Sequence, residues 1–206
     1  HFPLLGEMAG GVASPGIRNR ATLAGNLCSA VPCCDSGPAL LGYGAELVLK
    51  STAGKRRIDL ADWFIGPRAT VRKPREILVQ VRVSRPPTRH GAAFVKLRRY
   101  RGEDLAQASV AVVITPGWNY RIAFGAVAPT PVRSTLLEQV LHGRAPDDAA
   151  RAEAIRRLPA AIAPITDLRA TRDYRLHMAG VMLERGLQAA AGRLQGRGPA
   201  YGTELI

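Results

Sequence analysis

Hydrophobic and polar positions follow two different periods along this chain, and the period changes near residue 134. Between residues 46 and 127, apolar residues recur at alternate positions, which is typical of β-strands. The clearest case is the set Ile77, Val79, Val81 and Val83, which is expected to share one face of a strand. From Ser134 onward, apolar residues recur every three or four positions, which is typical of amphipathic helices. Strands followed by helices predict an α+β fold.

The two periods also predict individual elements. Strands are expected at Glu46–Lys50, Arg56–Leu60, Ile77–Val83, Ala93–Tyr100, Ala106–Ile114 and Tyr120–Val127. Polar or Pro-Gly turns join the last three strands and indicate an antiparallel sheet. Helices are expected at Phe2–Val12, Ala39–Leu41, Ser134–Leu141, Asp147–Leu158 and Thr171–Ala191. The remaining segments are predicted as extended chain with a small turn (Ile17–Leu27), a helical turn (Asp59–Gly66) and a linker rich in Pro and Arg (Ser84–Gly91).

Composition limits the class of protein. The chain has 206 residues, 47% of them hydrophobic, and a mean hydropathy of -0.02, as in ordinary globular proteins. No apolar run approaches the roughly 18 to 20 residues that a membrane span needs. The chain begins with His1 and shows no signal-peptide pattern, so we expect a piece of a longer chain.

The charge is strongly positive, with 29 Lys and Arg against 16 Asp and Glu, a net charge of +13. Such a surplus favours nucleic acid, an acidic membrane surface or an acidic protein partner. The basic residues are spread along the chain, and only 5% of residues are aromatic, so few side chains could stack on nucleic-acid bases. A solvated arginine-rich surface is the simplest interpretation, and nucleic-acid binding is a weaker alternative.

Three cysteines, Cys28, Cys33 and Cys34, lie within seven residues. An odd number with two adjacent members is a poor disulfide framework, which indicates a reducing, cytoplasmic setting. A zinc or iron–sulfur site usually needs four ligands, and no histidine stands nearby. We expect small buried or half-buried thiols.

The best candidate for chemistry is the small-residue turn Thr22–Asn26 with the loop that follows it. Small residues let a backbone approach a ligand, and neighbouring N–H groups can then bind phosphate oxygens. Asp35, nine residues beyond Asn26, could accept hydrogen bonds from ligand hydroxyls. The alternative is a plain tight turn, with Asp35 capping the next helix.

These residues also carry a family resemblance. IRNRATLAGNL followed by DSGPALL resembles the second FAD-binding segment of the flavoprotein (medium) subunits of molybdenum hydroxylases, which include xanthine dehydrogenase and carbon monoxide dehydrogenase. PREILVQVRV, AAFVKLRRYRGEDLAQASVAV, RIAFGAVAPTPVRSTLLEQVLHG and DLRATRDYRLHMAGVMLERGL resemble later segments of the family in the same order. The resemblance extends over most of the chain.

The resemblance implies a domain organisation. Residues 1–86 would form the second, antiparallel-sheet subdomain of a PCMH-like FAD-binding domain. Residues 87–192 would form the C-terminal domain, a small three-stranded sheet with a helical bundle, and residues 193–206 a tail. Members of the family carry an N-terminal FAD subdomain before these segments, so we expect this chain to hold only part of the FAD site. Ala24 replaces a usual glycine and is expected to weaken FAD binding.

The resemblance also implies roles for single residues. Thr22, Leu23, Ala24, Gly25 and Asn26 would line the phosphates and ribityl chain of FAD, and Asp35 would hold hydroxyls on the flavin side. Leu78 would pack beside the isoalloxazine, Lys96 would lie near it, and Val12 is near the cofactor in some members. The alternatives are a surface lysine for Lys96 and plain core positions for Val12 and Leu78.

The implied function is electron relay. Substrate would be oxidised at a molybdopterin centre on a large subunit, and electrons would pass through [2Fe–2S] clusters on a small subunit. FAD on this subunit would pass them to NAD, a quinone or oxygen. No general base is needed for that role. A cofactor-free scaffold subunit of such a complex is the main alternative.

Overall fold

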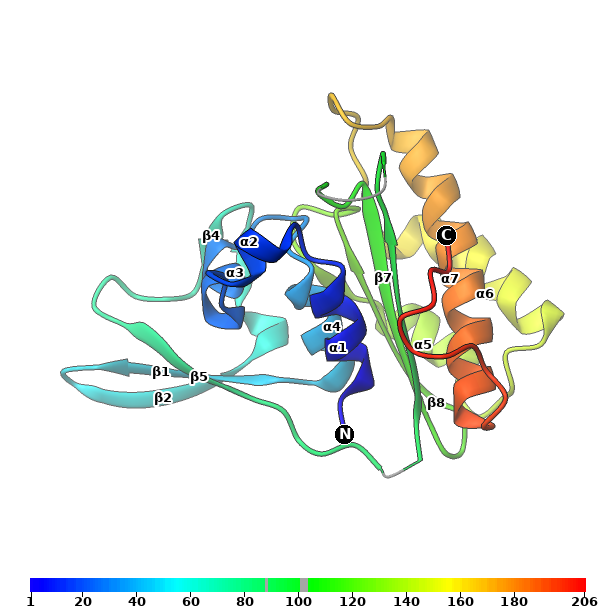
Figure 1. Ribbon diagram of the computed structural model, residues 1–206, viewed down its shortest axis with the longest axis horizontal. Coiled ribbons are helices and arrows are strands. Elements are labelled where there is room, and N and C mark those ends of the chain that lie inside the picture. Colours follow the sequence, from blue (N-terminus) through cyan, green and yellow to red (C-terminus); the bar gives the residue numbers. More distant parts are fainter. Residues whose placement is uncertain (88, 101–103) are drawn as a thin grey trace.

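The structure, a computed structural model, describes all residues except 88 and 101–103 (Figure 1). Its first half begins with four short helices: α1 (Pro3–Gly10), α2 (Pro15–Arg18), α3 (Leu23–Ser29) and α4 (Ser36–Tyr43). An antiparallel sheet follows, in the order β2-β1-β5, from β1 (Glu46–Ser51), β2 (Gly54–Asp59) and β5 (Ile77–Arg82). Between β2 and β5 lie η1 (Leu60–Asp62) and the hairpin of β3 (Phe64–Gly66) and β4 (Ala69–Thr70). The predicted helical turn Asp59–Gly66 is therefore half helical turn and half strand.

The prediction of extended chain over Ile17–Leu27 is wrong, because two side chains cap helices there. Ser14 accepts a hydrogen bond from the backbone N–H of Ile17 and starts α2. Thr22 accepts one from the N–H of Gly25 and starts α3. Both helices are too short to show a helical period in the sequence.

The alternation expected in β5 is broken by a bulge. The pairing of β5 with β1 shifts register between Val48 and Leu49. Leu78 before the bulge and Val81 after it consequently pack on the same core, whereas Ile77 and Val79 are 69% and 48% exposed. A bulge inserts one residue and turns the following side chains to the other face.

The second half is built on an antiparallel sheet in the order β6-β7-β8-β9. Its strands are β6 (Gly91–Leu97), β7 (Ala108–Thr115), β8 (Asn119–Gly125) and β9 (Val132–Arg133). The first three confirm the predicted strands. In the described residues, β9 extends the expected three-stranded sheet to four, because Val132 and Arg133 pair with Phe124 and Ala123.

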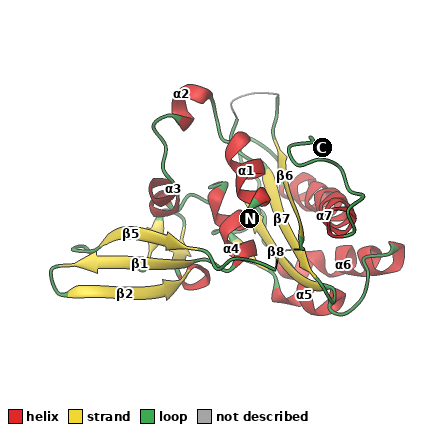
Figure 2. Ribbon diagram, turned by 60° about the horizontal axis from the view of Figure 1, so that its bottom comes forward, coloured by secondary structure: helices red, strands yellow, loops and turns green. Residues whose placement is uncertain are grey.

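Helices cover both faces of this sheet (Figure 2). The predicted C-terminal helices are present as α5 (Thr135–Leu141), α6 (Asp148–Ala161) and α7 (Arg172–Leu194), and they cover one face. Helices α1 and α4 cover the other face. On β6, for example, Val95 faces α7 and Phe94 faces α1. In the described part of the chain, no helix combines the length and the apolar character needed to cross a membrane.

The C-terminal residues turn back from α7 toward β6 and α1. Arg193 forms an ion pair of 2.7 Å with Glu7 of α1, and both side chains are buried. The Arg193 guanidinium also lies 4.1 Å from the centre of the Tyr201 ring. Leu205 and Ile206 pack against the core cluster under α7. The two ends of the chain are therefore joined.

Candidate functional site

The predicted small-residue turn is the first turn of α3. Thr22 has an extended backbone, and its Oγ1 accepts a hydrogen bond of 2.9 Å from the N–H of Gly25. The N–H groups of Leu23 and Ala24 have no acceptor within the helix, as at any helix N-terminus. Leu23 and Gly25 are exposed, so this turn presents its backbone to solvent.

Asn26 ties this turn to the start of α4. Its Oδ1 accepts hydrogen bonds from Ser36, at 3.2 Å from the backbone N–H and 2.6 Å from the hydroxyl. Ser36 directly follows Asp35, so the contact brings the turn and the carboxylate together. Because both lone pairs of Oδ1 are used, Asn26 can offer a ligand only its amide nitrogen.

Asp35 and Lys96 form a buried ion pair. Lys96 Nζ lies 2.7 Å from Asp35 Oδ2, and the two side chains are 6% and 9% exposed. Lys96 also donates to the carbonyl of Gly11, at 3.1 Å. Two alternatives are therefore wrong: Asp35 makes no helix-capping hydrogen bond, and Lys96 is not a surface lysine.

One oxygen of this pair lacks a partner. Asp35 Oδ1 is buried and accepts no hydrogen bond within the described residues. A buried acceptor without a donor costs about 1–3 kcal/mol, so such an atom marks a place for a ligand donor or a water. Burial raises the pKa of Asp35, and the charges of Lys96 and Arg98 oppose that rise. The site can therefore receive a hydroxyl or an N–H group.

Leu78 and Ala24 belong to one apolar cluster. Leu78 is buried there with Leu27 and Trp63, and Ala24 packs against the same cluster. The Trp63 indole donates a hydrogen bond of 2.9 Å to the carbonyl of Leu27, which fixes α3 on this core. Val12 packs instead against the separate cluster between α1, α4 and β6. The structure thus brings Leu78 close to the first turn of α3.

A cleft of about 470 Å³ opens beside Lys96. Its walls come from α1, β6 and the C-terminal residues, including Gly6, Gly10, Phe94 and Thr203. A Cβ added to Gly6 or Gly10 would meet nothing within 4 Å, so these glycines leave open space. The cleft gives a ligand access to the lysine end of the ion pair.

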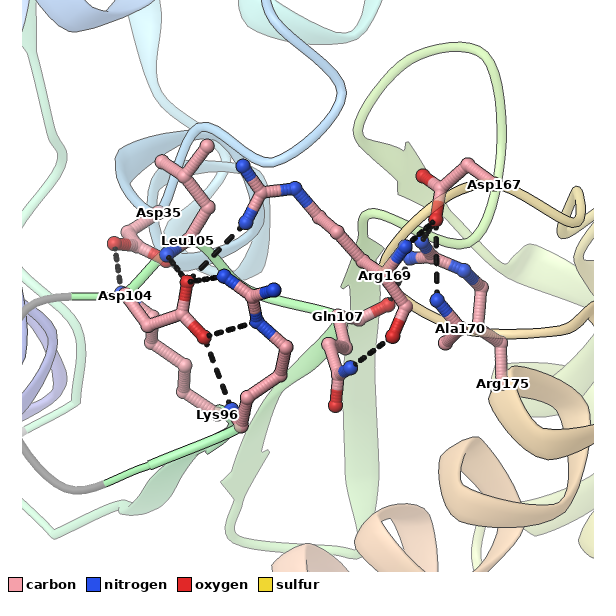
Figure 3. Close-up of polar contacts among 10 residues, drawn as sticks. Asp35, Lys96, Asp104, Leu105, Gln107, Asp167, Arg169, Ala170 and Arg175 are labelled. Carbon is pink, nitrogen blue, oxygen red and sulfur yellow. Dashed lines mark hydrogen bonds and ion pairs between the residues drawn. The ribbon is translucent and has the colours of Figure 1, made fainter.

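Sequence reasoning missed a network centred on Asp104 (Figure 3). The Asp104 side chain is 3% exposed and accepts hydrogen bonds from Arg99 and from Arg169, the latter at 3.2 Å. Hydrogen bonds from Arg99 lower the pKa of Asp104 to about 2. Close by, Asp167 accepts a bond of 2.6 Å from the buried Arg175. These residues stand in the family-like segments. The pair of Asp104 and Arg169 spans 65 positions, and nothing in the sequence indicates it.

The three cysteines differ in exposure: Cys28 is exposed, Cys33 is half-buried and Cys34 is buried. The expectation of buried or half-buried thiols therefore fails for Cys28. Burial raises the pKa of all three, that of Cys34 to about 12, which keeps them as thiols at neutral pH. Among the described residues, no group of three or more His, Cys, Asp and Glu could hold a metal ion.

Two known families match almost the whole chain. Residues 1–86 match the FAD binding domain in molybdopterin dehydrogenase, and residues 92–190 match the CO dehydrogenase flavoprotein C-terminal domain. The carbon monoxide dehydrogenase medium chain of Afipia carboxidovorans is 35% identical over 196 residues, covering 93% of this chain and 68% of that protein. The chain belongs to the FAD-binding subunits of the molybdenum hydroxylases. It is therefore an oxidoreductase subunit.

Other molybdenum hydroxylases show the same likeness. The xanthine dehydrogenase FAD-binding subunit of Escherichia coli O157:H7 is 32% identical, covering 95% of this chain and 70% of that subunit. Cyanide-inactivated Cu,Mo-CO dehydrogenase superposes with a TM-score of 0.88 at 35% identity, covering 93% of this chain and 68% of that one. Quinoline 2-oxidoreductase from Pseudomonas putida 86 superposes with a TM-score of 0.84 at 28% identity, covering 95% of this chain and 68% of that one. The predicted family and α+β fold are confirmed.

Proposed function

We propose that this subunit binds FAD beside α3, α4 and β6, and relays electrons through it from [2Fe–2S] clusters to NAD or another acceptor. The observation that carries the proposal is the buried pair of Asp35 and Lys96, with Asp35 Oδ1 unpartnered among the described residues. In a chain of this family, that oxygen is the best candidate for a direct contact with the cofactor.

The residues present fit FAD. Asp35 Oδ1 would accept a hydrogen bond from a hydroxyl of the cofactor, and the first N–H groups of α3, at Leu23 and Ala24, would bind phosphate oxygens. Lys96 would hold a positive charge beside the flavin and favour added negative charge there. When bound, FAD supplies reversible electron transfer, which the protein positions and tunes.

The other candidate residues would shape the site. Thr22 and Gly25 would keep the first turn of α3 compact, through the hydrogen bond that they share. Asn26 would hold that turn beside Asp35. Leu78 would supply an apolar wall. The weakening of FAD binding by Ala24 stays a prediction.

We further propose two partner subunits, a large one with molybdopterin and a small one with [2Fe–2S] clusters. The likeness to molybdopterin dehydrogenase and to Cu,Mo-CO dehydrogenase supports the molybdopterin partner. The net charge of +13 supports contact with acidic partners. In this scheme residues 1–86 hold most of the FAD contacts, residues 87–192 contribute Lys96, and residues 193–206 close the far side of its cleft.

FAD binding tests the proposal directly, by titration followed through flavin fluorescence. Asp35→Asn and Lys96→Met should each weaken binding about tenfold or more, since a hydrogen bond to a charged group contributes about 1.5–3 kcal/mol. Lys55→Met, at an exposed position of β2, is the matched control and should bind like the wild type.

The same titration decides between the proposal and the scaffold alternative. If the wild type holds no flavin even after assembly with molybdopterin and [2Fe–2S] subunits, the subunit is a cofactor-free scaffold. If only the two variants lose flavin, the pair of Asp35 and Lys96 is part of the site.

A further inference from the structure

The loop between α6 and α7 exposes two apolar side chains to solvent. In this segment, residues 162–171, Leu168 is 104% exposed and Ile165 is 64% exposed. Burying a leucine contributes about 1.5–3 kcal/mol, so a completely exposed leucine at a loop tip is available for a protein contact.

Hydrogen bonds hold the backbone of this loop, and Figure 3 shows them at Asp167, Arg169 and Ala170. Asp167 Oδ1 accepts hydrogen bonds from the backbone N–H groups of Arg169 and Ala170, at 2.8 and 3.2 Å. Gln107 donates its side-chain amide to the carbonyl of Arg169. Because these bonds fix the backbone, Leu168 is held in an exposed position, and the loop would lose little conformational freedom on binding a partner.

An apolar cleft of about 300 Å³ lies against the same loop. Its walls include Pro32, Pro67, Ala128, Pro129 and Ile165. The β3–β4 hairpin that carries Pro67 also exposes Ile65, at 65%. A partner surface could therefore place one of its own apolar side chains in the cleft, while Leu168 packs against that surface.

The cleft adjoins the proposed FAD site. Cys33 lines it and stands two residues before Asp35. The charges of Asp35, Lys96 and Arg169 all act on the Cys33 thiol. A protein bound over this cleft would consequently lie close to the buried ion pair.

The charges around the loop favour an acidic partner. Arg172 and Arg99 have side chains 61% and 46% exposed, and Arg169 is 33% exposed. Their carboxylate partners are Asp173 and Asp104, with Asp104 buried. Asp173 is 90% exposed and balances Arg172. Arg99 and Arg169, by contrast, share the one buried carboxylate of Asp104. These three arginines and two aspartates therefore keep a surplus of one positive charge, in a chain of net charge +13.

We propose that Ile165, Leu168 and the adjoining cleft form a docking surface for an acidic protein subunit, which inserts an apolar side chain into the cleft. The inference rests on the proposed function, because the partner is the subunit of that complex which delivers electrons to the site of Asp35 and Lys96. Leu168 acts as the central contact, and the rim arginines steer the partner.

The test uses the chain co-expressed with its molybdopterin and [2Fe–2S] subunits. Leu168→Glu and Ile165→Glu should each weaken association of the purified subunits about tenfold or more, since every 1.4 kcal/mol of binding energy is a factor of ten. Arg172→Glu should weaken it less, with a loss that shrinks as salt is raised. Leu136→Glu, at an exposed position of α5, is the control and should assemble normally.

Each outcome has a defined meaning. Affinities of Leu168→Glu and Ile165→Glu within twofold of the wild type would overturn the docking surface and leave the proposed function standing. A wild type that fails to assemble with either subunit would overturn both. A change in self-association alone would assign the surface to a second copy of this chain and overturn the acidic partner. Unfolding midpoints of the glutamate variants equal to that of the wild type exclude misfolding as the cause. Leu168→Ser serves as a milder variant for the same comparison.

Discussion

Lys96 contacts the buried carboxylate of Asp35 directly, so stability should depend on that lysine. We expect Lys96→Met to lower the free energy of unfolding by about 3–5 kcal/mol, because a buried charge then loses its partner. The double variant with Asp35→Asn should lose clearly less, since no charge is left buried. Urea denaturation measures both. Equal losses would show that Lys96 matters through packing and not through its charge.

Asp104 and Asp35 should respond to pH in opposite directions. Hydrogen bonds from Arg99 lower the pKa of Asp104 from 3.8 to about 2, so its stabilisation is complete above pH 3.8 and is lost as the pH falls toward 2. Burial raises the pKa of Asp35 above 3.8, so its ionisation lowers stability as the pH rises through that raised value.

The stability lost in Asp104→Asn should therefore shrink as the pH is lowered from about 5, and Asp35→Asn should gain on the wild type as the pH rises above about 4. Urea unfolding at a series of pH values, down to the lowest at which the fold persists, measures both differences. A constant difference across the series would contradict the assignment for that residue.

Sequence reasoning can name single candidate residues but cannot supply the partners that they contact. The family resemblance points to both Asp35 and Lys96, and the structure places them in contact across 61 positions. Their contact with FAD stays a prediction. Asp104 has one partner nearby, Arg99, but Arg169 lies 65 positions later and only the fold brings it to the same carboxylate.

At the scale of elements, the contribution of the α3 cap to stability can be measured by itself. Thr22→Val should lower the free energy of unfolding by about 1 kcal/mol, because the N–H of Gly25 loses its acceptor. Thr22→Ser keeps the hydroxyl and should stay close to the wild type. Thermal unfolding of the two variants side by side measures the cap. Equal destabilisation by both would show that the methyl group, not the hydroxyl, is what matters at this position.

Long elements with a regular period could be predicted, and short ones held by tertiary contacts could not. The strands β6 to β8 and the helix α7 follow their patterns closely. Helix α3 has poor intrinsic propensity, and it persists because Leu27 is buried and its carbonyl receives the Trp63 indole. The bulge beside Val79 likewise depends on pairing with β1, which no local pattern records.

At the scale of the whole molecule, one sheet serves as the common wall of both halves. Residues 108–114 of β7 are all buried, so this strand is covered on both of its faces. The sequence could not show that α1 and α4, from the other half, cover one of these faces. That arrangement is what carries Asp35, just before α4, to Lys96 on β6.

The contact between α7 and β6 holds this wall together, and Gly91 is the position where it is closest. A Cβ on Gly91 would lie 1.8 Å from the carbonyl oxygen of Ala190, a distance that the helix can relieve only by moving off the sheet. We expect Gly91→Ala to lower the free energy of unfolding by about 3 kcal/mol, at the upper end of the usual loss from overpacking.

Gly6→Ala is the matched control, because a Cβ there meets nothing within 4 Å and the residue lies inside α1. Alanine is the better helix former, so this variant should gain about 0.5–1 kcal/mol. Urea unfolding followed by far-ultraviolet circular dichroism measures both variants. If Gly91→Ala matched the wild type, α7 would have room to shift along the sheet, and the ion pair between Arg193 and Glu7 would become the main link holding α7 to α1. Loss of stability in Gly91→Ala alone would establish the close packing of α7 on β6 as the contact on which the shared sheet depends.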